Sequence, residues 1–241
     1  MLRGDDVAEL QQRLGALGFD AGRVDGIFGD DTAGAVREFQ RNAGLPDDGI
    51  LGATTLLELL RVQGRHQALE PVAVVHDRER LRQARPTLAG RHLAVGETGG
   101  LGPALGALRR RLASGGALVT SLHHPDGSAQ AAAANAVEAD VYVGLRLDPG
   151  HPGCSTAYYA GYHYESPGGR RLAELVQAEV PAALGVPDLG VQGLSVPVLR
   201  ETRMPAVIVE IGPARAVVEK GALLAAALGA ALASWAGAAW D

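Results

Sequence analysis

The chain has 241 residues, of which 47% are hydrophobic, so it is long enough to bury one sizeable core and to hold a small additional domain. Its net charge at pH 7 is -5, whereas proteins that bind nucleic acid usually carry a basic face, so we expect no nucleic-acid partner. The single cysteine, Cys154, excludes an internal disulfide and is compatible with a reducing compartment.

The N-terminus leads directly into an amphipathic helix. Residues 1–6 are not followed by the apolar stretch of about 7 to 15 residues that an export signal requires. If Met1 is the native start, we therefore expect a cytoplasmic protein, and otherwise a protein of the cell envelope.

Residues 1–62 contain an internal repeat and are expected to form a separate unit. The sequence of residues 25–29, followed by Thr32, returns in residues 48–52, followed by Thr55. Each copy predicts a tight glycine turn and a threonine that caps the next helix. Apolar residues at helical spacing predict three short helices around one small core: Val7, Leu10, Leu14 and Leu17, then Ala35, Val36 and Phe39, then Leu56, Leu59 and Leu60.

This unit closely resembles the peptidoglycan-binding domain 1 family, through the repeat and through Leu17-Gly18-Phe19 and Gly44-Leu45. The resemblance implies a shallow groove that contacts cell-wall sugar or peptide, with Phe19, Asp25 and Phe28 as candidates for the surface near it. Spacing alone explains the two phenylalanines as core residues and Asp25 as a turn former. A docking module for another protein is the alternative.

Residues 63–88 are charged and are expected to form a linker. Residues 89–241 then alternate between strand and helix patterns, which predicts an α/β domain with a mixed, twisted sheet flanked by helices. The expected strands are 92–96, 117–122, 141–147, 155–160, 196–200 and 206–211, and the expected helices are 103–113, 129–139, 170–180 and 222–236.

The uncharged run 222–240 approaches the roughly 20 residues that span a bilayer. It is mostly alanine and glycine, and its larger residues form one stripe at helical spacing. We therefore predict a helix packed on the sheet and no transmembrane segment. The stripe consists of Leu224, Leu228, Leu232 and Trp235.

The second domain resembles the zinc-dependent N-acetylmuramoyl-L-alanine amidases, through residues 95–100, 139–146 and 205–212. In that family the first segment reads Asp-Pro-Gly-His-Gly-Gly and the second ends in a histidine, and a glutamate between them completes the metal site. The resemblance implies that Thr98 and Arg146 occupy the two histidine positions and that Glu210 is the catalytic acid. Residues 101–112 contain no acidic residue.

The replacement of the two histidines by Thr98 and Arg146 predicts that the metal is lost. A catalytic zinc site needs about three nitrogen or anionic ligands, and a guanidinium never loses its proton in proteins. We therefore expect no cofactor, and Glu210 without a metal-bound water to activate. Because functional crevices of α/β sheets lie beyond strand ends, Thr98, Arg146 and Glu210 should converge there. We also hypothesise that Arg146 pairs with Glu210.

A metal site rebuilt from other residues is the alternative, and it would use His151, Glu97 and Glu210. His151 belongs to Asp148-Pro149-Gly150-His151-Pro152-Gly153, which looks like the zinc motif but follows the wrong strand. Aspartate, proline and glycine form a turn without any ligand, so a plain loop explains this segment as well.

Three functions fit the sequence. The first is an amidase homologue without catalysis that binds peptidoglycan or its precursors, contacts cell-wall synthesis proteins, and regulates or scaffolds wall metabolism. This function follows from a resemblance to the zinc-less amidase homologues of actinobacteria. The second is an active, zinc-dependent amidase that hydrolyses the bond between N-acetylmuramic acid and L-alanine. The third is a simple cell-wall anchor in which only residues 1–62 matter.

Overall fold

The computed structural model describes residues 3–63, 79, 81–83, 86–161 and 165–239. The chain divides into two compact units: residues 1–80 with 161–164, and the remainder. The predicted linker, 63–88, lies mostly outside the described residues.

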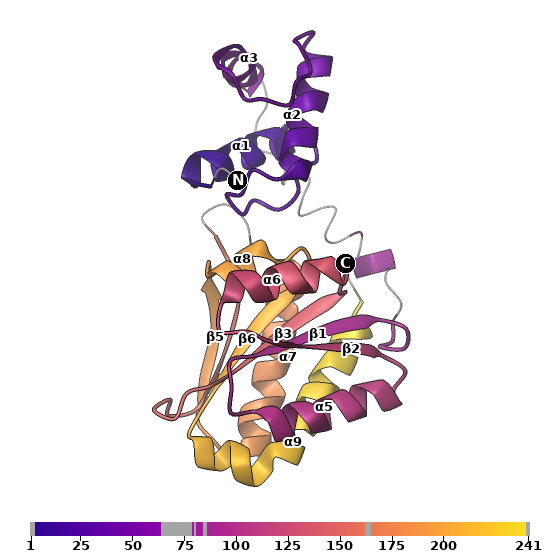
Figure 1. Cartoon of the computed structure of the whole chain (residues 1–241), viewed down its shortest axis with the longest axis vertical. Coiled ribbons are helices and arrows are strands. Elements are labelled where there is room, and N and C mark those ends of the chain that lie inside the picture. The colour runs from indigo at the N-terminus through magenta and orange to yellow at the C-terminus, as the bar shows by residue number, and fades with distance from the viewer. Residues whose placement is uncertain (1–2, 64–78, 80, 84–85, 162–164, 240–241) are drawn as a thin grey trace. The chain divides into compact units, whose positions relative to one another are not determined.

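The first unit contains the helices α1 (Asp5–Ala16), α2 (Asp30–Asn42) and α3 (Ala53–Gln63) (Figure 1). Their apolar faces meet in one small core, as predicted, but α3 contributes less to it than expected. Leu59 is fully buried, whereas Leu56 and Leu60 are 40% and 43% exposed. Only the narrow face of α3 that carries Thr55 and Leu59 turns inward, because three short helices enclose little volume.

The two repeats share a buried hydrogen-bond network that the sequence reading missed. In the first, Gln11 Nε2 donates to Asp25 Oδ1 (2.9 Å), to the carbonyl of Ile27 (3.0 Å) and to Thr32 Oγ1 (3.0 Å). The expected threonine cap is wrong, because α2 begins at Asp30 and Thr32 lies inside it as the partner of the glutamine. The second repeat uses Gln40, Asp48, Ile50 and Thr55 in the same way.

The second unit is built on a six-stranded mixed sheet in the order β2-β1-β3-β6-β4-β5. Neighbouring strands are parallel except for β4 and β6, which are antiparallel. The carboxyl ends of β1, β3 and β6 therefore meet at one edge of the sheet. The strands are β1 (His92–Glu97), β2 (Leu118–His123), β3 (Val141–Leu147), β4 (Cys154–Tyr159), β5 (Asp188–Leu194) and β6 (Ala206–Ile211).

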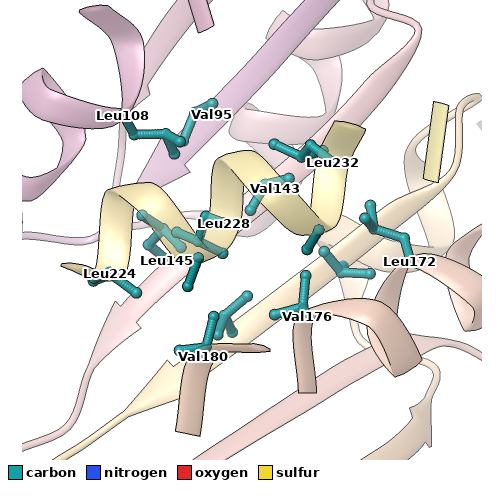
Figure 2. Close-up of a cluster of buried hydrophobic side chains, with 14 of the residues drawn as sticks. Val95, Leu108, Val143, Leu145, Leu172, Val176, Val180, Leu224, Leu228 and Leu232 are labelled. Atoms are coloured by element: carbon teal, nitrogen blue, oxygen red, sulfur yellow. The ribbon is translucent and has the colours of Figure 1, made fainter. Parts of the chain in front are cut away.

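Helices cover both faces of this sheet (Figure 1). On one face lie α5 (Gly102–Ser114), α7 (Pro167–Leu184) and α9 (Ala214–Ala236), and on the other lie α6 (Gly127–Ala136) and α8 (Pro197–Glu201). The first group buries the main apolar core against the sheet, as Figure 2 shows. Its members include Val95, Leu108, Val143, Leu145, Leu172, Val176, Leu224, Leu228 and Leu232.

Two expectations about the C-terminal half were wrong. Where a strand was expected at 196–200, the chain forms helix α8 (Pro197–Glu201), because Pro197 occupies the first helical position, where its missing N–H costs nothing. Strand β5 was missed because Gly190 and Gly193 interrupt its pattern, and because an edge strand with little burial shows no apolar run.

Helix α9 is long and apolar enough to span a membrane by length and composition, with 44% of the tested window buried. Its predicted stripe is confirmed as the buried face, since Leu224, Leu228, Leu232 and Trp235 are 0–1% exposed. Trp235 Nε1 also donates to the carbonyl of Gly168 in α7 (2.9 Å). These contacts are those of a core helix.

Candidate functional site

The carboxyl ends of β1, β3 and β6 place the predicted site residues at one edge of the sheet. Thr98 follows β1 directly, and Arg146 in β3 pairs in register with Glu210 in β6. Side chains alternate along a strand, so Arg146 and Glu210 point to the same face, the one covered by α6 and α8. Thr98 is exposed, and the other two residues are half-buried.

Thr98 and Arg146 line one small pocket on this face, with about 260 Å³ of free space that is open to solvent. Glu210 is not among its lining residues, although its strand neighbour Arg146 is. The structure thus brings two of the three candidates into one pocket and leaves the third beside it. The other lining residues are Gly96, Glu97, Pro125, Gly127, Gln130, Tyr142, Gly144, Leu145, Val198 and Ile208.

A buried polar network forms the floor of this pocket. The Tyr142 hydroxyl donates to Gln130 Oε1, and Gln130 Nε2 donates to the carbonyls of Glu97 and His124. Burial raises the pKa of Tyr142, so its hydroxyl stays a neutral donor. A Cβ at Gly96 would lie 1.9 Å from Gln130 Oε1, so only glycine leaves room for the network.

Sequence reasoning missed this network, although a signal was present. In the alanine run 129–136 of α6, the polar residues are Gln130 and Asn135. Polar side chains in an otherwise apolar helix face need partners when they are buried. Asn135 also has them, since its side chain donates to the carbonyl of Glu201 (2.8 Å) and accepts from Arg203 N (2.9 Å).

The hypothesised ion pair between Arg146 and Glu210 does not form. In the part of the chain that the structure describes, neither residue has an ion-pair partner within 4.0 Å. Both lie near strand ends and keep access to water, which stabilises separated charges nearly as well as pairing does. The site therefore holds two neighbouring charges of opposite sign that are free to bind other groups.

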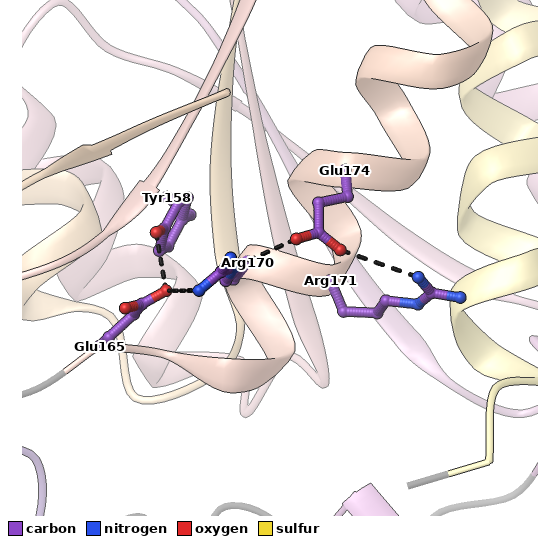
Figure 3. Close-up of polar contacts among 5 residues, drawn as sticks. All are labelled: Tyr158, Glu165, Arg170, Arg171 and Glu174. Atoms are coloured by element: carbon purple, nitrogen blue, oxygen red, sulfur yellow. Dashed lines mark hydrogen bonds and ion pairs between the residues drawn. The ribbon is translucent and has the colours of Figure 1, made fainter. Parts of the chain in front are cut away.

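Several charged residues elsewhere in the unit form ion pairs. At the opposite end of β4, Glu165 accepts from the Tyr158 hydroxyl (2.7 Å) and pairs with Arg170 (3.0 Å), as Figure 3 shows. Arg170 and Arg171 both pair with Glu174. Burial and the nearby Glu165 raise the pKa of Tyr158 to about 12.

Glu97 and His151 do not join Glu210 in a rebuilt metal site. Glu97 is buried, its carboxylate accepts from Leu101 N (3.0 Å), and it lies 2.9 Å from His123 Nδ1. His151 Nε2 contacts Ser155 Oγ (3.2 Å), and Ser155 pairs in register with Glu210. Within the described ranges, no three His, Cys, Asp or Glu residues are grouped so that they could hold a metal ion.

The donor set at the strand ends does not fit zinc. Glu210 supplies one carboxylate, Thr98 supplies a neutral hydroxyl, and Arg146 supplies only donors and a positive charge. Three nitrogen or anionic ligands are needed, and a guanidinium repels a dication. No chemical step through a metal can be built on these three residues.

In the first unit, the candidates for peptidoglycan contact each have a role in the fold. Phe19 packs edge-to-face on Phe39, with ring centroids 5.6 Å apart, and Phe28 packs against the same core. Asp25 accepts from Gln11 and from Ile27 N (2.8 Å), and burial raises its pKa. All three candidates are half-buried, and their contact with a ligand stays a prediction.

Comparisons with known proteins agree with this architecture. Residues 3–59 match the putative peptidoglycan binding domain family, and residues 106–227 match the N-acetylmuramoyl-L-alanine amidase family. The chain is 37% identical over 240 residues to the N-acetylmuramoyl-L-alanine amidase CwlM of Mycobacterium tuberculosis. That match covers 88% of this chain and 59% of the relative, so the chain spans about three fifths of its length.

The first unit has a second group of relatives. It is 52% identical over 58 residues to a spore cortex-lytic enzyme of Bacillus cereus, and this match covers 24% of this chain and 22% of that enzyme. Among solved structures, the amidase Ami1 of Mycobacterium smegmatis matches with a TM-score of 0.54 and 17% identity, over 63% of this chain and 99% of Ami1. At this identity the structural match shows the shared fold alone.

Proposed function

Because the chain belongs to the N-acetylmuramoyl-L-alanine amidase family, through a match to residues 106–227 of its 241, we propose that it is a member without hydrolytic activity. It binds peptidoglycan or its precursors and acts as a regulator or scaffold of cell-wall metabolism. The observation that carries this proposal is the chemistry at the strand ends, where Thr98 and Arg146 stand beside Glu210.

Hydrolysis of an amide needs an activated water. In zinc hydrolases the metal lowers the pKa of that water and polarises the carbonyl, and a carboxylate takes the proton. Glu210 supplies a carboxylate, but Arg146 and Thr98 supply no ligand that would hold the metal beside it. The pocket keeps groups that recognise polar ligands and lacks the group that generates a nucleophile.

Wall binding is supported by the first unit, whose residues 3–59 match a family of putative peptidoglycan binding domains. A protein that joins such a unit to a second unit whose pocket binds but does not hydrolyse its ligand is suited to sensing wall material or its precursors. Cell-wall synthesis proteins are the partners that such a sensor would act on.

Measurement of metal content and hydrolysis together tests the proposal. The full chain is incubated with zinc, separated from free metal and analysed by elemental analysis, and then mixed with dye-labelled cell wall. We expect well below one zinc per chain and no dye release, while an active amidase of the family serves as the positive control. Stoichiometric zinc together with dye release would establish the active amidase instead.

Sedimentation with insoluble peptidoglycan, repeated in the presence of soluble muramoyl peptides, distinguishes the sensor from the simple anchor. Both bind the insoluble wall, but only the sensor also binds soluble muramoyl peptides through its second unit. If the chain sediments with the wall and no soluble fragment competes or binds, the anchor is the better description.

A further inference from the structure

Strand β2 forms one edge of the six-stranded sheet, and its outer side has no strand partner in the part of the chain that the structure describes. Leu118 N donates to the carbonyl of Arg91 (2.9 Å), which precedes β1. Backbone groups alternate in direction along a strand, so the N–H and C=O groups of Val119 and Ser121 point away from β1. The edge therefore offers hydrogen-bond donors and acceptors to another strand.

The opposite edge strand, β5, is protected against such pairing, and β2 is not. β5 contains an exposed aspartate, Asp188, and its register with β4 shifts between Cys154 and Thr156. Charges and irregular register at a sheet edge prevent edge-to-edge association. Residues 118–122 of β2 are uncharged and include neither proline nor glycine, and their register with β1 is regular. An edge left open in this way suits an added strand.

The face of β2 on the α6 side is apolar. Leu122 pairs in register with Gly96, whose missing Cβ would point at Gln130 in α6, so Leu118 and Leu122 share this face. Leu118 is 61% exposed, and Leu122 is half-buried. Side chains directly opposite each other on paired strands interact, so a strand added here gains contacts if its side chains on this face are apolar.

Arg109 determines the chemistry of the other face. Helix α9 packs on α5 and on α7, and so lies over the middle of the sheet, with Arg111 of α5 against Gly229 of α9 (Figure 2). Helix residues two apart point about 200° away from each other, so Arg109 lies on the side of α5 nearest the β2 edge. Arg109 is exposed and has no ion-pair partner within 4.0 Å among the described residues.

We propose that the β2 edge binds an extended segment of a partner protein in which acidic and apolar residues alternate. The backbone of the segment pairs with β2, its apolar side chains pack beside Leu118 and Leu122, and its acidic side chains face Arg109. This inference rests on the part of the proposed function that gives the chain a protein partner. None of the residues 118–123 lines the pocket, so the two surfaces are separate.

A second copy of the chain fits this edge less well. Two β2 strands paired about a two-fold axis perpendicular to the sheet place the α5 helices of both copies on one face. Arg109 lies near the middle of α5, so it would come close to the same residue of the other copy. Like charges repel each other, whereas an acidic segment is attracted.

Three capped peptides of equal length test this, by fluorescence anisotropy with the full chain at low salt. The first alternates valine and glutamate, the second alternates valine and lysine, and the third is the first with an N-methyl group on every backbone nitrogen. We expect the first to bind about fivefold more tightly than the second, because the contact with Arg109 changes from attraction to repulsion. It should bind at least about tenfold more tightly than the third, which has no N–H donors. Equal binding of all three, or no binding of the first at about 1 mM, would overturn the proposal.

Hydrogen exchange locates the bound peptide. In the free chain the outward amides of Val119 and Ser121 should exchange faster than the inward amides of Thr120 and Leu122, and the valine-glutamate peptide should slow them. Protection of Val119 and Ser121 in the free chain would refute the proposal. Loss of that protection on dilution would identify a second copy as the occupant, and protection at every concentration would identify a segment of the chain itself.

Two variants make the same charge change on opposite sides of α5. Arg109→Gln should remove the preference for the glutamate peptide over the lysine peptide, whereas Arg111→Gln, the matched control, should keep it. The preference should persist in neither case through unfolding, because both positions are exposed and the melting temperature should stay that of the parent. An unchanged preference in Arg109→Gln would contradict the assignment of the acidic face.

Zinc content and dye release test the proposed function separately. A hydrolytically active chain whose edge binds the valine-glutamate peptide would refute the proposed function alone. An inactive chain that binds none of the three peptides would refute this inference alone.

Discussion

Replacement of Gln11 by leucine should destabilise the first unit more than the same change at Gln40. Gln11 is 3% exposed, and its side chain accepts from Asp25 N (3.1 Å) and Gly26 N (2.9 Å) besides donating to three oxygens. Leucine keeps the volume and removes all five contacts. Because two Nε2 hydrogens are shared among three acceptors, this amounts to about four full hydrogen bonds, each with a net value of about 1 kcal/mol. The buried polar groups that remain without a partner add to this loss.

We therefore expect a loss of at least about 3 kcal/mol in the free energy of unfolding of this unit. For a unit of about 60 residues, this lowers the melting temperature by roughly 12 °C or more. Gln40 makes a similar set of bonds, but its partner Asp48 is exposed and water replaces the lost bond, so Gln40→Leu should cost roughly half as much.

Scanning calorimetry of the full chain gives the melting temperature of the unit, and hydrogen exchange of the amides of Gly26 and Gly49 reports each repeat separately. Both amides donate to the glutamine of their own repeat, so each variant should raise exchange first at its own glycine. Equal destabilisation by the two variants, or protection at Gly26 that survives Gln11→Leu, would contradict the reasoning.

The remaining predictions concern the pH dependence of stability and the substitution of a tightly packed glycine. Burial raises the pKa of Asp25, so the contribution of Asp25 to stability is present below the unfolded pKa of about 3.8 and is lost as the pH rises through the folded pKa. The hydrogen bonds from Ile50 and Gln40 lower the pKa of Asp48, so the contribution of Asp48 is present above its unfolded pKa and is lost as the pH falls through the folded pKa. Urea unfolding of Asp25→Asn and Asp48→Asn between pH 3 and 7 should therefore show opposite trends relative to the parent, and parallel trends would contradict this assignment. Gly96→Ala should cost about 1–3 kcal/mol because its Cβ would collide with Gln130, whereas Gly102→Ala, with nothing within 4 Å, should unfold like the parent in the same assay.

The sequence was most informative where side-chain periodicity and burial agree. Strand 141–147 and the buried stripe of α9 were predicted at the correct residues, because each has one continuous apolar face. The α/β class and the mixed sheet with helices on both faces are confirmed for the same reason. Strand β5 and helix α8 were not found, because glycines and a proline decide them more than apolar spacing does.

The site was only partly predictable. Parallel strands bring residues at their carboxyl ends together, and this rule placed Thr98 and Arg146 in one pocket. The same rule says nothing of side-chain contacts, so the hypothesised ion pair was wrong. The alanine run of α6 marks Gln130 as a residue that needs a partner, but the identity of that partner, Tyr142, depends on tertiary contacts between β3 and α6 that the local pattern does not specify.

The floor of the pocket and the two charged residues at the strand ends, Arg146 in its lining and Glu210 beside it, differ in what they contribute to the protein. Tyr142 and Gln130 are at most 4% exposed and satisfy each other, so removing either leaves an unpaired polar group and costs stability. Arg146 and Glu210 are half-buried without an ion pair, so neither depends on the other for neutralisation. Substitution at the floor should therefore lower the melting temperature, whereas substitution of Arg146 or Glu210 should change ligand affinity at nearly constant stability.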